Sequence, residues 1–311
     1  MSKHLHLGII FKGTNLNYGE SMGNYTSLKK CSIGEQTYSY ITRQAIRYDI
    51  VRIMEEECGY DKAEIDNVQK VVQFASGAKI TDYPEIDFFG YMKTEKKKSN
   101  KDEDKNQSDN EGKTKIRKAI ARISDAVSLE PFYNEIDFST NMGLAARKNL
   151  ENQIYQTETH RSYYSYSVTV DLDKVGVDEN DSVNLDTTEK IKRLKALFYS
   201  VKTLNRDIKG RRENLNPIFV IGGIYESGNP FFYNQLKLSF SKDGVFLNEN
   251  IVNSILETQL FNEKPIKNNT QAGAVDGHFK NTDKLNIEIK SVEEFFTNLN
   301  NKIKQYFEGQ N

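Results

Sequence analysis

The stretch Tyr38–Arg52, which reads YSYITRQAIRYDIVR, is the most informative part of the chain. Ile46 and Ile50 begin an apolar stripe with helical spacing, so the stretch is predicted to be an amphipathic helix. Arg43 and Arg47 lie four residues apart and are expected to project together beside that stripe. Two planar, permanently charged guanidinium groups on a rigid helix suit a phosphate backbone. The alternative is a surface helix whose arginines are solvated.

The composition indicates a polar protein that does not enter a membrane. Of the 311 residues, 37% are hydrophobic, and no apolar run approaches the length of a membrane span. The N-terminal MSKHLHLGII alternates and lacks a cleavage pattern, so it is predicted to be a strand rather than a signal peptide. Cys31, Cys58 and the four histidines show no metal-ligand spacing. We therefore expect no zinc site, disulfide framework or cofactor, and a reducing cytoplasm as the location.

Charge is unevenly distributed along the chain. The formal net charge is only -1, but acidic residues concentrate in Glu55–Glu57 and Asp102–Glu111. Many lysines and arginines lie instead in segments that are predicted to be ordered. Local patches rather than the total decide phosphate binding, so a nucleic-acid partner remains compatible with this composition.

The first half of the chain reads as strands around one helix. His4–Phe11 is a predicted strand, followed by the Gly/Asn-rich loop Gly13–Asn24. Val68–Phe74 and Glu85–Met92 are further strand candidates. Thr94–Lys115 has no apolar residue to bury and is predicted to be a disordered insertion within a domain.

The second half contains the clearest strand. Ser128–His160 is predicted to be irregular, whereas Ser162–Leu172 alternates and is predicted to be a half-buried strand. Pro217–Tyr225 reads as a buried strand. Gly222 and Gly223 within it lack the lysine and spacing of a phosphate-binding loop, so they are expected to admit a neighbouring backbone.

Two more helices are predicted. Thr187–Lys209 keeps a helical apolar period and is expected to stop at Gly210. Ser291 and Glu294 form a capping box before a C-terminal amphipathic helix.

The resulting order of elements is β-α-β-β-α-β, an α+β arrangement of the ferredoxin-like or RNA-recognition-motif (RRM) kind. The sheet of such a fold commonly presents aromatic and polar side chains to single-stranded RNA. Fold alone does not establish function.

Many blocks of the sequence, in the same order, resemble one known family. It is the backbone subunit of CRISPR type I Cascade complexes in the subtype I-B branch, also called the DevR-like autoregulator family of the RAMP superfamily. The blocks are NYGESMGN, YSYITRQAIRYDIVR, DYPEIDFFGYMKTE, SLEPF, TNMGLAAR, HRSYYSYSVTVDLDKVGVDE, RDIKGRREN and GGIYESGNPFF. The charged insertion and the stretch after about Ser239 are not diagnostic.

The resemblance implies a non-catalytic protein that binds the CRISPR guide RNA (crRNA). It implies an RRM-like palm (1–92 and 162–240), finger and thumb insertions (93–161) and a C-terminal helical part (241–311). Copies of the chain would stack into a filament along the crRNA beside other Cascade subunits, and each thumb would kink the RNA. The free bases would pair with target DNA, so the protein reads backbone shape while base pairing supplies sequence specificity.

The arginine helix and the loop before it supply the first candidate RNA contacts. Arg43, Gln44 and Arg47 are expected to contact phosphate and 2′-hydroxyl groups. The alternative is that one of them pairs with Asp49 or Glu55.

In the loop, Asn17 and Asn24 are candidates because Gly19 and Gly23 allow a close approach to RNA. Lys29 would add nonspecific phosphate attraction. The alternatives are an ordinary strand-to-helix connection and an exposed lysine.

The middle of the chain supplies four more candidates. Asn141 and Met142 form the predicted thumb tip, where Met142 would wedge beside a base at the kink. The alternative is a methionine that fills a gap in the core. His160 and Arg161 are expected to stack on RNA or hydrogen-bond to it. The alternative for His160 is a structural histidine.

Arg211 and Arg212 complete the candidates. With Arg206 and Lys209 they are predicted to cluster at a helix C-terminus and the following turn, where cations also offset the helix dipole. They would contact phosphate or form an ion pair between subunits.

Two other functions stay open from the sequence. Asp137 lies in the thumb-like segment and could serve an endoribonuclease, although one carboxylate without a partner motif is thin support. A DNA-binding autoregulator is suggested only by the family's other name, and no helix-turn-helix pattern supports it.

Overall fold

The computed structural model describes residues 2–68, 71–94 and 114–309. Within them, nine strands form one main sheet. They are β1 (His4–Thr14), β4 (Lys30–Ile33), β5 (Gln36–Ile41), β10 (Ala121–Ile123), β11 (Ala126–Ser128), β14 (Arg161–Asp171), β19 (Phe219–Tyr225), β22 (Thr270–Ala274) and β23 (Ile289–Ser291). The order is β23-β22-β19-β1-β14-β11-β5-β4, and β10 also pairs with β14.

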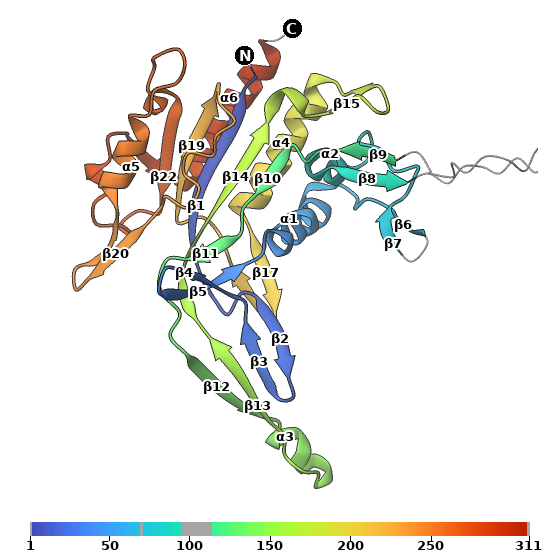
Figure 1. Ribbon diagram of the computed structural model, residues 1–311, viewed down its shortest axis with the longest axis vertical. Coiled ribbons are helices and arrows are strands. Elements are labelled where there is room, and N and C mark those ends of the chain that lie inside the picture. The colour runs from blue at the N-terminus through green and yellow to red at the C-terminus, as the bar shows by residue number, and fades with distance from the viewer. Residues whose placement is uncertain (1, 69–70, 95–113, 310–311) are drawn as a thin grey trace, which may run out of the picture.

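The long strands β1 and β14 form the centre of the sheet (Figure 1). They are antiparallel and in register from the pair His4↔Asp171 to the pair Thr14↔Arg161. β19 pairs with the other edge of β1, and β10 and β11 pair with β14, all antiparallel. Helix α1 (Arg43–Cys58) follows β1 along the chain, and α4 (Thr187–Lys202) joins β14 to β19. The predicted α+β class is confirmed.

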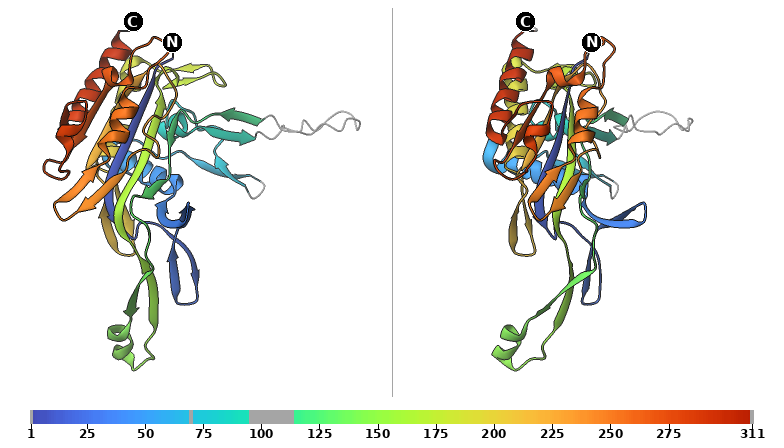
Figure 2. Two further views of the ribbon diagram at one scale, coloured as in Figure 1. Left: turned by 60° about the vertical axis from the view of Figure 1, so that its left-hand side comes forward. Right: turned by 90° about the vertical axis from the view of Figure 1, so that its left-hand side faces the viewer.

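Three helices cover one face of the sheet: α1, α4 and α6 (Val292–Glu308) (Figures 1 and 2). Ile46 and Ile50 of α1 are buried there, as the apolar stripe predicted. The predicted alternation of β14 is also confirmed. Successive side chains of a strand point to opposite faces of the sheet. This core accordingly contains every second residue, namely Tyr164, Tyr166, Val168, Val170 and Leu172, whereas Tyr163 lies on the opposite face.

A second apolar layer covers much of the opposite face. Phe232 and Leu236 pack there with α5 (Glu249–Leu256), against side chains that include Tyr163. A Cβ atom on Gly8 would lie 2.6 Å from the Cβ of Phe232, so this layer needs glycine in β1. The expected use of an open sheet face for RNA therefore does not hold over this area. The C-terminal part, predicted to be helical, also supplies β22 and β23.

The predicted arginine helix begins later than expected. Tyr38–Ile41 belongs to β5, and the helix starts at Arg43 after the N-cap residue Thr42, whose hydroxyl accepts a hydrogen bond from the Ala45 amide. The aromatic and β-branched residues at the front of the stretch favour a strand, whereas a threonine N-cap fixes where a helix begins.

The strand predicted over Glu85–Met92 is wrong. Pro84–Phe89 forms helix α2, and Tyr91–Thr94 forms strand β8. Six helical residues are too few to display a period, although proline at the first position is a helix signal. β8 pairs with β9 (Thr114–Arg117), so both described ends of the predicted insertion Thr94–Lys115 are strand. The remainder of that insertion lies outside the described residues.

The strand predicted over Val68–Phe74 is half of a hairpin. β6 (Ile65–Val68) pairs with β7 (Val71–Phe74), and residues 69–70 between them lie outside the described residues.

The second predicted helix ends earlier than its apolar spacing indicates. α4 stops at Lys202, and the rest of Thr187–Lys209 enters a hairpin of β17 (Asn205–Ile208) and β18 (Arg211–Asn214). Lys209 and Gly210 form its turn with φ of 46° and 75°. A two-residue turn with positive φ favours a hairpin, so Gly210 marks this turn rather than a helix end. The basic cluster therefore lies on a hairpin, not at a helix C-terminus.

The region Ser128–His160 was predicted to be irregular, but Ser128 ends β11 and residues 135–159 form a projecting arm (Figure 1). It consists of β12 (Glu135–Thr140), α3 (Met142–Ala145), a 3-10 turn and β13 (Ile154–Thr159). β12 is exposed along its whole length, so it lacks the apolar-in, polar-out contrast that marks a strand in sequence. β13 pairs with β3 of the hairpin β2 (Tyr18–Met22) and β3 (Tyr25–Leu28).

Two smaller predictions are confirmed. The Ser291 hydroxyl accepts from the Glu294 amide at 3.1 Å and caps α6. A Cβ on Gly222 or Gly223 would lie 2.0 Å from a backbone oxygen of a neighbouring segment, as close approach requires.

No helix within the described ranges is long and apolar enough to cross a membrane. The remaining strands form two hairpins: β15 (Val177–Asp178) with β16 (Val183–Asn184), and β20 (Leu238–Ser241) with β21 (Gly244–Leu247).

Candidate nucleic-acid interface

The N-terminus of α1 presents two of the predicted contacts to solvent. Arg43 and Gln44 are both exposed at the first turn. The Arg43 amide donates to Asp125 at 2.7 Å, which fixes the backbone and leaves the side chain free of any ion pair among the described residues. A guanidinium group that forms no ion pair among the described residues favours an anion such as phosphate.

Arg47 is engaged within the chain. Its guanidinium lies 3.3 Å from a carboxylate oxygen of Glu85 and 4.7 Å from the ring centre of Phe89, both on α2. Its ion-pair partner is therefore neither Asp49 nor Glu55, the two considered from sequence. About a third of the side chain remains exposed, so Arg47 is a weaker candidate than Arg43.

The two asparagines of the loop before α1 have structural partners. Asn17 is buried, and its amide nitrogen lies 3.3 Å from the Thr42 hydroxyl. Asn24 is exposed, but its side chain donates to the Ile154 carbonyl at 2.9 Å and links the β2–β3 hairpin to the arm. Lys29 is half-buried. These placements fit positioning of the loop better than direct contact by both asparagines.

His160 is buried at the root of the arm. Its Nδ1 lies 2.7 Å from the Ser39 hydroxyl, and its backbone amide donates to Asn15 at 2.6 Å. Phe132 packs edge-on against the imidazole at 5.5 Å. Burial lowers the pKa of His160, which keeps the ring neutral. The structural alternative fits this placement, and contact with RNA through the ring does not.

Arg161, Arg211 and Arg212 lie at the end of the sheet near Thr14. Arg161 is exposed and its Nε donates to the Thr14 hydroxyl at 3.3 Å, and Arg211 reaches the Thr14 carbonyl at 3.4 Å. Arg212 is exposed but makes two hydrogen bonds to Asp207, each 2.8 Å long. Arg161 and Arg211 therefore belong to one surface, whereas Arg212 is already paired.

Helix α3, with Asn141 as its N-cap residue and Met142 as its first residue, lies at the far end of the arm, away from the sheet (Figure 1). Met142 is exposed, as are Leu144 and Leu150, so Met142 fills no core gap. Asn141 is held within the tip, where its side chain accepts from the Gln153 amide at 2.8 Å. An apolar tip on a projecting arm can insert into a partner.

Glu158, which the sequence did not single out, anchors the arm to the body. Its buried carboxylate accepts from the Tyr25 hydroxyl at 2.5 Å, the Leu28 amide at 2.8 Å and the Lys30 ammonium at 2.6 Å. Burial alone would raise the pKa of Glu158, but these hydrogen bonds outweigh it and hold the pKa below its ordinary value. A lone glutamate within an exposed stretch gives no sequence signal of this role.

Several of the predicted residues thus converge on the C-terminal end of β1 and the residues that follow it, 14–17, which we call the foot of β1. Residues 14–17 contact Arg161, Arg211 and His160 directly, and they contact the start of α1 through Thr42. Arg43, Gln44, Arg161 and Arg211 are the predicted contacts with exposed side chains in this region, and we call these four the foot surface. Asn141 and Met142 lie apart from it, at the arm tip.

Comparison with known proteins places these features in a family. Residues 6–237 match the family described as CRISPR-associated negative auto-regulator DevR/Csa2. A CRISPR-associated protein Cas7/Cst2/DevR of Myxococcus xanthus (strain DK1622) is 30% identical over 165 residues, which are 50% of this chain and 52% of that protein. The match thus spans about half the length of that curated relative.

Solved structures share the fold at low identity. A chain of a CRISPR RNA-guided surveillance complex in a pre-nicking state superposes with a TM-score of 0.60 at 11% identity, covering 96% of this chain and 100% of that one. A chain of a second CRISPR RNA-guided surveillance complex gives the same score and identity over 97% and 99%. The family match covers most of the sequence, and the chain belongs to the DevR/Csa2 family of CRISPR-associated proteins.

Proposed function

We propose that this chain is a crRNA-binding backbone subunit of a CRISPR surveillance complex of the I-B branch, acting in the cytoplasm. The observation that carries the proposal is the foot surface, where exposed cationic and amide side chains from three parts of the chain lie around residues 14–17 beside a projecting arm. Guanidinium groups bind phosphate through paired hydrogen bonds, so such a surface can follow an RNA backbone without reading its bases.

The topology supports an RRM-like palm. Along the chain, β1, α1, β10 and β11, β14, α4 and β19 succeed one another, and in the sheet β19 and β14 flank β1. This is the strand order of a split β-α-β fold, with both connecting helices on one face. Because the second apolar layer covers much of the sheet face opposite the helices, the proposed RNA path runs near the end of the sheet, where Lys12 and Arg161 are exposed.

The arm supports the roles of a thumb and of a filament contact. Its tip exposes Met142, Leu144 and Leu150, which together form an apolar group with no cover within the described residues. In a head-to-tail stack of copies, the tip would be covered by the RNA and the next copy. A repeated heterologous contact of this kind generates a helical filament.

We further propose that the chain binds RNA without cutting it. Asp137 lies on the exposed strand β12, and the hydrogen bond to its carboxylate comes from the Ser139 hydroxyl at 3.4 Å. Metal-assisted hydrolysis usually draws on several ligands around one point. Incubation of labelled RNA with the wild-type chain, magnesium and an Asp137→Ala control tests this point. Cleavage that the substitution removes would contradict it.

The function as a whole is tested by expressing the chain with its partner subunits and a repeat-spacer array. We expect a large assembly that contains RNase-sensitive RNA of uniform length. A chain that stays monomeric and free of RNA, even when guide RNA is added at low salt, would contradict the proposal. Binding to its own promoter under those conditions would support the autoregulator instead.

A further inference from the structure

Arg211, Arg161 and Lys12 form a basic strip that continues from the foot surface along the central strands. The strip lies on the sheet face opposite helices α1, α4 and α6. The side chains of Lys12 and Thr14 lie on the same face of β1. In the antiparallel pairing, Lys12 lies beside Tyr163 of β14 and Thr14 lies beside Arg161. Because side chains two residues apart share a face, the charges of Arg161 and Lys12 are neighbours. Arg211 meets this strip at Thr14. Sequence reasoning used Arg161 and Arg211 but not Lys12.

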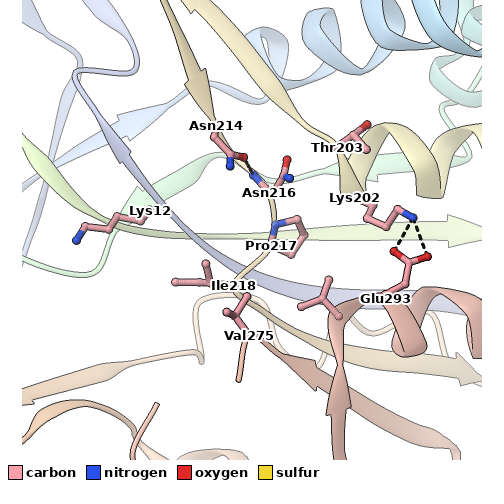
Figure 3. A pocket seen from close by; sticks show the side chains of 10 residues that line it. Lys12, Lys202, Thr203, Asn214, Asn216, Pro217, Ile218, Val275 and Glu293 are labelled. Atoms are coloured by element: carbon pink, nitrogen blue, oxygen red, sulfur yellow. Dashed lines mark hydrogen bonds and ion pairs between the residues drawn. The ribbon is translucent and has the colours of Figure 1, made fainter. Parts of the chain in front are cut away.

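Lys12 is exposed and free of carboxylates. Its ammonium lies over the Tyr163 ring at 5.3 Å from the ring centre, and it forms no ion pair within the described part of the chain. Lys12 also lines one end of a groove of about 600 Å³, whose walls include Pro217, Ile218 and Val275. Figure 3 shows the other end of this groove at the Lys202–Glu293 ion pair, with the Lys12 side chain directed away from that pair.

An exposed aromatic ring completes the strip. Phe240 on β20 is 45% exposed, and its ring centre lies 5.7 Å from that of Tyr163. The buried Tyr163 ring is therefore in contact with both Lys12 and Phe240. His278 packs edge-on against the same tyrosine at 5.7 Å. Burial, together with the charge of Lys12, lowers the pKa of His278, so this imidazole stays neutral.

We propose that Lys12 and Phe240 form a second RNA contact, in which Phe240 stacks on a base and Lys12 binds the adjoining phosphate. The proposal rests on the proposed crRNA-binding function and extends its path beyond the foot surface. A cationic track that is interrupted by exposed aromatic rings is the usual way to hold single-stranded nucleic acid without sequence preference. Lys12 and the exposed foot arginines favour a phosphate chain over an apolar protein partner.

The carboxylates near the strip do not form ion pairs with Lys12 or Arg161 among the described residues. Glu130 accepts hydrogen bonds at Oε2 from the Ser162 hydroxyl at 2.9 Å and the Tyr163 amide at 3.4 Å, and it forms no ion pair with Lys12 or Arg161 among the described residues. Glu213 lies 3.5 Å from Arg211 and also accepts from the Thr14 amide at 3.3 Å. Lys12 and Arg161 remain without a carboxylate partner among the described residues.

The test uses the full chain, a fluorescent single-stranded RNA and fluorescence anisotropy at one fixed salt concentration. Phe240→Ala is expected to weaken binding about 5- to 100-fold, as loss of one stacked base does, while Phe240→Tyr binds about as well as wild type. Phe261→Ala is the matched control, because Phe261 is 95% exposed and lies outside the strip. Equal affinities for Phe240→Ala and Phe261→Ala would overturn the proposal.

Lys12→Gln provides a second test that leaves the aromatic ring in place. Loss of one phosphate contact is expected to reduce the slope of log affinity against log salt by about 0.7. An unchanged slope would overturn the phosphate role. Arg43→Ala separates this proposal from the function on which it rests. If Arg43→Ala weakens binding but Phe240→Ala and Lys12→Gln do not, only the second contact fails. If the wild-type chain binds no RNA, both fail.

Discussion

Arg43 and Arg212 show why equal residue types do not carry equal roles. Both were predicted to contact RNA, but Arg43 is free, whereas Arg212 is held by two hydrogen bonds to Asp207. We expect Arg43→Ala to weaken RNA binding about 10- to 100-fold, since hydrogen bonds to charged groups contribute about 1.5–3 kcal/mol. Arg212→Ala should have a much smaller effect. Anisotropy titrations of both variants at the same salt concentration check this, and the reverse ranking would contradict the assignment.

His6 makes a pH-dependent contribution to stability. Its imidazole is buried, with Nε2 2.7 Å from the Ser227 carbonyl oxygen. Burial lowers the pKa from 6.5 to about 4, although the Ser227 carbonyl opposes this shift. The unfolded chain therefore takes up a proton at a higher pH than the folded chain. The contribution is fully present above about pH 6.5 and is lost as the pH falls towards 4.

The full loss amounts to about 3 kcal/mol of unfolding free energy, from the cost of each pH unit by which the pKa falls. We expect His6→Gln, which can still donate to the Ser227 carbonyl, to lose less stability between pH 7 and pH 4.5 than wild type. Urea unfolding of both proteins at the two pH values measures the difference. Parallel losses would show that His6 does not titrate in this way.

At the scale of elements, helices and strands with a strong apolar period were predicted correctly from the sequence. Short or fully exposed helices and strands were not. The stripe of Ile46 and Ile50, the alternation of β14 and the Ser291 cap all reflect burial or capping that a local pattern records. Helix α2 escaped because a six-residue helix has no full period. The arm strand β12 escaped because neither of its faces is buried.

The candidate site was only partly accessible from sequence for a related reason. Residue type and spacing indicated Arg43, Arg161 and Arg211, but whether an arginine is free depends on partners that are distant in sequence. Arg47 meets Glu85 of α2, and His160 meets Ser39 of β5. Lys12 and Phe240 are separated by 228 positions along the chain and come together only through Tyr163.

The arm depends on Glu158 for its attachment. Glu158→Gln would turn an amide donor towards the three groups that now donate to this carboxylate. We expect the arm root to lose about 1–3 kcal/mol, the cost of a buried donor left without its partner. Hydrogen exchange should then increase in residues 25–28 and 154–159, with β1 and β14 unchanged. Glu151→Gln, at an exposed position of the arm, is the control. Equal exchange in the two variants would contradict the anchoring role.

At the scale of the whole molecule, the body is one main sheet with an apolar layer packed on each of its faces. An arm with an apolar tip extends beyond this body (Figure 1). We expect the double substitution of Met142 and Leu144 by serine to leave the melting temperature unchanged, because both side chains are exposed. The RNA-dependent assembly should become smaller, because the tip would no longer insert into its partner. Light scattering with and without guide RNA measures this, and assemblies of wild-type size would contradict the role of the tip.

We expect the guide RNA to cross the C-terminal end of β1 and the residues that follow it. The most direct measurement is crosslinking of guide RNA that contains 4-thiouridine to the assembled protein, followed by identification of the crosslinked peptides. We expect crosslinks in peptides that contain residues 14–17, 43–44, 161 or 211, and at the arm tip. Crosslinks confined to α5 and α6, with none at the foot of β1, would contradict it.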